Sequence, residues 1–81
     1  MQTIDTLTDI FRDVFDEPDL SISPDTSTDD IKDWDSVAQV NLVLTIESVF
    51  GIRLTMEEAT EINSVAGFID AIEKYSSAIK N

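Results

Sequence analysis

Apolar residues recur at three- and four-residue steps near the start of the chain, which is the spacing of one face of an α-helix. This face consists of Ile4, Leu7, Ile10, Phe11, Val14 and Phe15. Thr3 is suited to cap the helix, because its hydroxyl can accept a hydrogen bond from a free backbone N–H. Since Pro18 disfavours helical geometry at the residue before it, the helix should end near Phe15 or Asp16.

Residues 17–34 have no such periodicity and are rich in Pro, Ser, Thr and Asp, which predicts a long loop. Eighteen irregular residues are unusual in so short a chain and indicate either a function or a buried anchor. Four apolar side chains are suited to anchor the loop to the core: Leu20, Ile22, Ile31 and Trp34. Near Asp29–Lys32 we also expect a short helical turn.

A second helix is expected to open at Asp35-Ser36 and to end at Phe50, where Gly51 can adopt the left-handed conformation that closes helices. After it, Thr55 and Glu58 have the spacing of a capping box, which predicts a short third helix.

Asn63 or Ser64 should cap the last helix. Its core face consists of Val65, Phe68, Ile69, Ile72, Tyr75 and Ile79. The alternating pattern of strands is absent from the sequence. The predicted fold class is therefore all-α: a four-helix bundle with a short third helix and a long loop between the first and second helices.

Two apolar stripes lie on nearly opposite sides of the second helix when its residues are placed about 100° apart. One should face the core and consists of Leu42, Val43, Ile46, Val49 and Phe50. The other consists of Val37, Val40 and Leu44. A helix that is apolar on both sides is either buried all round or presents one face to a partner. Both interpretations stay open from the pattern alone.

The 81 residues include 17 acids, five bases, no Cys and no His, for a net charge of −12. So acidic a chain repels phosphate, which argues against nucleic acid and anionic membranes and in favour of cationic partners. Without Cys and His, thiolate zinc sites, cysteine nucleophiles and the commonest general base are excluded. No signal peptide is evident and no apolar run approaches the ~18 residues of a membrane span, so we expect a cytoplasmic protein without membrane insertion.

The acid-rich residues 25–36 have the length of a calcium-binding loop but not its key residues. Asp30 stands where the loop needs Gly, and Ser36 stands where it needs a bidentate Glu. We therefore expect no metal site. Paired acids such as Glu57 and Glu58 are best explained as solvated surface, so we also expect no catalytic residues.

Ser36, at the start of the second helix, has two interpretations. It can be a cap, since Ser36 and Gln39 have capping-box spacing, although Asp35 is an equally good cap. Alternatively, its hydroxyl is modified, because a phosphate attached there would meet free backbone N–H groups and a favourable helix dipole. An unassisted nucleophile is not expected in a chain without His.

Asp35-Ser36-Val37 heads an apolar helix ending in Phe50-Gly51, and Glu57-Glu58-Ala59 and Ile62-Asn63-Ser64-Val65 follow. This combination resembles an acyl carrier protein. The resemblance covers nearly the whole chain, including its size, acidity, helix order and long first loop. It implies a single acyl carrier domain over residues 1–81, and the Met start without linkers favours a free-standing chain. We expect it to be a monomer.

The resemblance further implies that Ser36 carries 4′-phosphopantetheine, donated from coenzyme A by a separate phosphopantetheinyl transferase. By the same resemblance, we expect a carrier that is not an enzyme. The thiol of its arm holds acyl groups as thioesters and presents them to acyl-loading, condensing or acyl-transfer enzymes with basic docking patches. The implied docking residues are Asp35, Val37, Val40, Leu44 and Glu47.

Departures from the commonest pattern favour a specialised carrier, serving a polyketide, hybrid or other dedicated pathway. Val37 stands where Leu usually follows the serine, and Trp34 is more typical of such carriers. Fatty-acid carriers often have acids at four positions that are here Ala38, Asn41, Ser48 and Val49.

Two alternatives stay open. An aminoacyl or peptidyl carrier of a nonribosomal peptide pathway would share the fold, the cofactor and the serine, although the strong acidity favours an acyl carrier. An unmodified helical adaptor would use Ser36 only as a helix cap.

Overall fold

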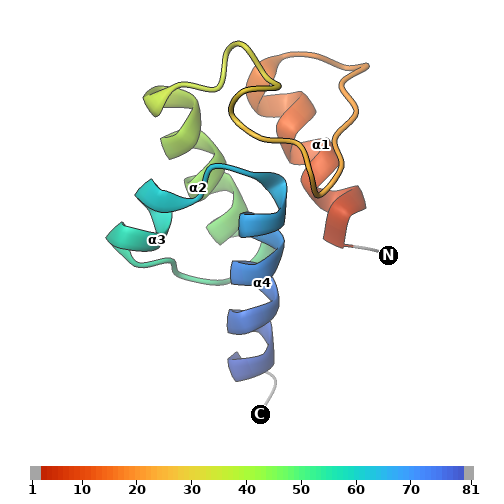
Figure 1. The fold of residues 1–81 in the computed structure, drawn as a ribbon. Helices are drawn as coiled ribbons and strands as arrows, with labels where there is room; N and C mark the ends of the chain where they lie inside the picture. Colours follow the sequence, from red (N-terminus) through yellow and green to blue (C-terminus); the bar gives the residue numbers. More distant parts are fainter. Residues whose placement is uncertain (1–2, 80–81) are drawn as a thin grey trace.

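The computed structural model describes the backbone of residues 3–79 and the side chains of residues 3–75. Its helices are α1 (Thr3–Phe15), α2 (Ser36–Phe50), α3 (Met56–Glu61) and α4 (Val65–Ile79). Figure 1 shows three long helices, with the short α3 between α2 and α4 in the chain and a long loop joining α1 to α2. Residues 3–79 form no strand, so the predicted fold class is confirmed.

The helix ends follow local chemistry. After α1, Asp16 adopts a left-handed conformation with φ 54°, and the N–H of Glu17 donates to the carbonyl of Arg12 at 2.9 Å. Thr3 is the first residue of α1 as described, so the prediction that it caps the helix is wrong. Gly51 closes α2 with φ 66°, as predicted.

The last two helices begin as their sequences indicate. Thr55 and Glu58 form both hydrogen bonds of the predicted capping box at the start of α3. Of the two candidate caps for α4, Asn63 and Ser64, the structure favours Ser64, because its hydroxyl accepts from the N–H of Gly67 at 3.2 Å. The side chain of Ile79, expected on the core face of this helix, lies outside the described residues.

Among residues 3–75, fifteen buried apolar side chains form the core, including the predicted Leu7, Phe11, Leu42, Ile46, Val65, Phe68 and Ile72. The prediction for Val49 is wrong, since 54% of it is exposed. It lies in the last turn of α2, and the chain that reverses at Gly51 places Ile52 and Leu54 in the core instead.

The long loop is anchored by apolar side chains, as predicted. Trp34 and Ile31 are buried, while Leu20 and Ile22 pack against the core less completely. Trp34 contacts Phe11 edge-on, with ring centroids 5.3 Å apart, and stacks on Phe68 at 6.2 Å.

The expected helical turn near Asp29–Lys32 does not form. Two separate turns take its place, closed by hydrogen bonds from Asp30 N–H to the Ser27 carbonyl and from Trp34 N–H to the Ile31 carbonyl. The carboxylate of Asp30 accepts from the N–H of Ser27 at 3.0 Å. Such local side-chain bonds to the backbone compete with helix formation.

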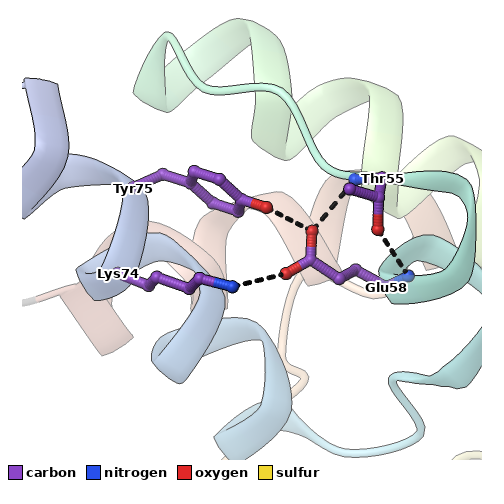
Figure 2. A network of polar contacts seen from close by, with 4 residues as sticks. All are labelled: Thr55, Glu58, Lys74 and Tyr75. Atoms are coloured by element: carbon purple, nitrogen blue, oxygen red, sulfur yellow. Dashed lines mark hydrogen bonds and ion pairs between the residues drawn. The ribbon is translucent and has the colours of Figure 1, made fainter.

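Glu58 joins the start of α3 to α4 (Figure 2). Its Oε1 accepts hydrogen bonds from the Tyr75 hydroxyl and from the N–H of Thr55. Its Oε2 forms an ion pair with Lys74 Nζ at 3.3 Å. These contacts, the Tyr75 hydrogen bond foremost, lower the pKa of Glu58 from 4.5 to about 2. The ionised form is therefore the one that holds the two helices together.

Glu58→Gln should reduce the free energy of unfolding at pH 7 and change its dependence on pH. Because the folded-state pKa lies below the unfolded one, the contribution of Glu58 is complete above pH 4.5 and is lost as the pH falls towards about 2. Urea unfolding at several pH values measures this. The difference in free energy of unfolding between parent and variant should be largest at neutral pH. It should decrease as the pH falls from 4.5 to about 2.

Glu57→Gln is the matched control, since Glu57 is exposed on the same turn of α3. Two results would contradict this role of the ionised carboxylate. One is a difference in free energy of unfolding between parent and Glu58→Gln that stays constant from pH 7 to pH 2. The other is an equal difference for both variants.

Candidate functional site

Ser36 is the first residue of α2 and is exposed, with a hydroxyl that bonds to no described residue. The cap is Asp35, whose Oδ1 accepts from the N–H of Ala38 at 2.9 Å. The capping-box interpretation of Ser36 with Gln39 is therefore wrong. Because Asp35 satisfies only the third amide of the helix, the N–H groups of Ser36 and Val37 at its start stay available to an anionic group.

The second apolar stripe of α2 is uncovered among the described residues. Val37 is 69% exposed, Val40 56% and Leu44 58%. The opposite stripe faces the core as predicted, with Leu42, Val43 and Ile46 buried. Residues 3–75 therefore do not bury both stripes, which favours the interpretation that one face is presented to a partner.

Four positions of α2 lack the acids that fatty-acid carriers often have there, and these positions differ in their surroundings. Asn41, Ser48 and Val49 are exposed, so acids there would have reached solvent. Ala38 is only 8% exposed and faces the core. Burial therefore explains why this position is uncharged, and the difference from fatty-acid carriers at Ala38 carries no functional meaning.

A groove of about 540 Å³ runs between α2 and α3 and begins at Ser36. Its walls are mainly apolar: Trp34, Val40, Val43, Leu44, Ala59 and Ile62. Polar residues around it are Thr28, Asp35, Gln39, Thr60 and Asn63. The groove thus brings four predicted site residues together: Asp35, Ser36, Val40 and Leu44. Val37 is outside its lining, on the exposed stripe.

Glu47, the remaining predicted docking residue, is outside this groove. It is half-buried, and its Oε2 accepts from the N–H of Leu54 at 2.8 Å. It carries the only ionisable side chain of α2. Apart from Asp35, which directly precedes Ser36, the nearest acids in the chain come from the preceding loop, where Asp29, Asp30 and Asp33 are exposed.

Gln39 was missed as a site residue by the sequence analysis. Its amide bonds to Trp34 and to the carbonyls of Ala59 and Ile62, so it lies between the groove and the core. Those carbonyls are 20 and 23 residues away along the chain. No periodicity or spacing motif signals a contact of that kind.

Membrane-spanning helices and clusters of metal ligands are both absent from the part of the chain that the structure describes. None of its helices is long and apolar enough to cross a membrane. No group of three or more His, Cys, Asp or Glu side chains there is arranged to hold a metal ion.

Comparisons with known proteins agree with the geometry. A family model described as a phosphopantetheine attachment site matches residues 5–72. The chain is similar to the solution NMR structure of a holo acyl carrier protein from Geobacter metallireducens, with 33% identity and a TM-score of 0.86. That similarity covers 98% of this chain and 91% of the other. A search of curated proteins found no match.

The family match spans most of the chain, and the structural similarity extends over nearly all of it. An exposed hydroxyl at a helix start, with free amides beside it, fits a group attached through a phosphate. The cofactor is thus a covalently attached 4′-phosphopantetheine, and the protein is a carrier rather than an enzyme. The chain belongs to the phosphopantetheine attachment family, as a carrier of the acyl carrier protein type.

Proposed function

We propose that Ser36 carries the 4′-phosphopantetheine arm and that the chain is an acyl carrier domain over residues 1–81. The observation that supports this most directly is that the hydroxyl of Ser36, at the start of α2, is exposed and bonds to no described residue. Asp35 leaves that hydroxyl free by capping the helix itself. The N–H groups of Ser36 and Val37 would stabilise the phosphate of the arm.

When attached, the arm supplies a thiol that carries an acyl group as a thioester. The protein's own residues contribute position rather than chemistry. The tether keeps the cargo at high effective concentration for whichever enzyme docks. Because Ser36 opens a groove with apolar walls, the arm can lie along α2 between encounters.

The proposed docking face is the exposed stripe Val37, Val40 and Leu44, with Asp35 and Glu47 at its ends. Apolar side chains more than half exposed in one stripe are typical of an interaction surface. Asp35 adds negative charge beside Ser36. Glu47 is held in place by the N–H of Leu54, so it offers a fixed carboxylate at the far end.

The proposed partners are a phosphopantetheinyl transferase and enzymes that load, condense or transfer acyl groups, acting in the cytoplasm on a monomer. We propose a specialised pathway, polyketide, hybrid or otherwise dedicated. The exposed, uncharged side chains of Asn41, Ser48 and Val49 support this, because a partner that binds α2 through several basic residues would find one carboxylate on it.

Incubation with coenzyme A, magnesium and a broad-specificity phosphopantetheinyl transferase should add one phosphopantetheine to the parent and none to Ser36→Ala, measured by intact mass. Since Ser36 is not the cap, its replacement should change the free energy of unfolding by less than about 0.5 kcal/mol.

Ser48→Ala is the matched control, because Ser48 is an exposed serine of the same helix. It should be modified as fully as the parent. No mass gain in a folded, initially unmodified parent would refute the assignment of Ser36, as would undiminished modification of Ser36→Ala.

Leu44→Ala should raise the KM of the transferase for the carrier about tenfold, equivalent to about 1.4 kcal/mol, because truncation removes apolar contact from the docking face. The turnover number at saturating carrier should change little, since Leu44 lies two turns from the modified serine. Steady-state kinetics on the unmodified carrier separate the two quantities.

Val49→Ala provides the comparison for this prediction. Val49 is 54% exposed and Leu44 58%, on the same helix but on different sides of it. Val49→Ala should leave the KM unchanged, and equal effects of the two truncations would mean that the proposed stripe is not the docking face.

A further inference from the structure

The short helix α3 has little apolar burial to hold it in place. None of its six residues is fully buried. The chain is fixed before it at Leu54, which is buried and donates its N–H to Glu47. It is fixed again after it, where the carbonyl of Asn63 accepts from the N–H of Thr28 at 3.0 Å. Between those points, individual contacts decide where α3 lies.

The contact that joins α3 to α2 is made by Gln39. Its Nε2 donates two hydrogen bonds, to the carbonyl of Ala59 at 2.7 Å and to that of Ile62 at 2.9 Å. Its Oε1 accepts from the indole N–H of Trp34 at 2.7 Å. Carbonyls near the end of a helix lack partners within it, so this one amide satisfies groups that α3 itself cannot.

Ala59 and Ile62 also belong to the wall that α3 and the residues after it give to the groove beginning at Ser36. The other wall is the α2 face that includes Val40 and Leu44. The amide that fixes α3 therefore also fixes the width of the groove, and it does so from the first turn after the serine.

We propose that Gln39 is a positioning residue: it holds the C-terminal end of α3 against the start of α2 and so sets the groove wall beside Ser36. Through Trp34 the same amide ties this wall to the aromatic core. One part rests on the proposed function, namely that the arm on Ser36 lies along this groove.

Loss of Gln39 should release one end of α3 only. Its N-terminal end stays attached to α4 through Glu58, Tyr75 and Lys74 (Figure 2). The side chain of Ile62 also packs closely on α4, since a Cβ added at Gly67 would lie 3.0 Å from Ile62 Cγ2. The expected change is thus confined to the hydrogen bonds around residues 59–62 and to the Trp34 indole.

Amide hydrogen exchange of the unmodified protein tests the attachment. Gln39→Met keeps the length of the side chain but forms none of the three hydrogen bonds. The amides of Ala59 and Ile62 and the indole N–H should exchange at least about tenfold faster, while those in α1 and α4 keep the parent rates. Trp34 is the only tryptophan, so its indole signal is unambiguous.

Gln39→Asn is a second variant, polar but one methylene too short to reach both carbonyls, and it should give the same local pattern. Asn41→Met is the matched control, because Asn41 is an exposed amide on the same helix. Unchanged exchange at Ala59 and Ile62 in both Gln39 variants would overturn the proposal. Equal acceleration in every helix would also overturn it, since Gln39 would then be a residue of general stability.

A separate measurement tests whether the arm on Ser36 lies along this groove. Attachment of the arm, verified by mass, should shift the amide resonances of Ala59 and Ile62 in the parent and should do so much less in Gln39→Met. A modified parent without such shifts would refute the role of the groove and leave Ser36 assigned. Failure to modify Ser36 would refute the proposed function, while the exchange result would still stand.

Discussion

The contact of Trp34 with Phe11 and Phe68 is the constraint on which the rest of the structure depends. A chain of 81 residues has a thin core, so one large side chain decides much of its packing. Trp34 ends the long loop inside the core, between rings from α1 and α4. The next residue caps α2 and the one after it is Ser36. The position of the serine at the surface is therefore set by an aromatic contact beneath it.

Trp34 also links the aromatic core to the polar contacts that position α3. Its ring belongs to the core, while its N–H reaches Gln39 and, through that amide, the end of α3. Polar contacts can position a helix that has no fully buried residue, because an unpaired half-buried carbonyl is costly. Glu58 acts similarly at the other end of α3, with its carboxylate ionised at neutral pH (Figure 2). The groove wall is thus held by these hydrogen bonds together with the partial packing of Ala59 and Ile62.

What the sequence could predict was local. The capping box at Thr55, the closing glycine at position 51 and the amphipathic faces of the helices depend on residues within a few positions of each other. What it could not predict depends on tertiary structure. The Gln39 contacts join distant segments, and Val49 is exposed while Ile52 and Leu54, after the reversal at Gly51, are buried.

The distribution of charge gives the proposed docking face its character. Eleven of the 17 acids precede Ser36, whereas α2 has Glu47 alone. Electrostatic attraction acts over about 10 Å at ordinary ionic strength, but apolar contact requires touching surfaces. In the proposed docking, the acids before Ser36 would therefore draw a basic partner towards that end of α2. The uncharged stripe would then select the partner whose surface fits, so that rate and specificity are set by different segments.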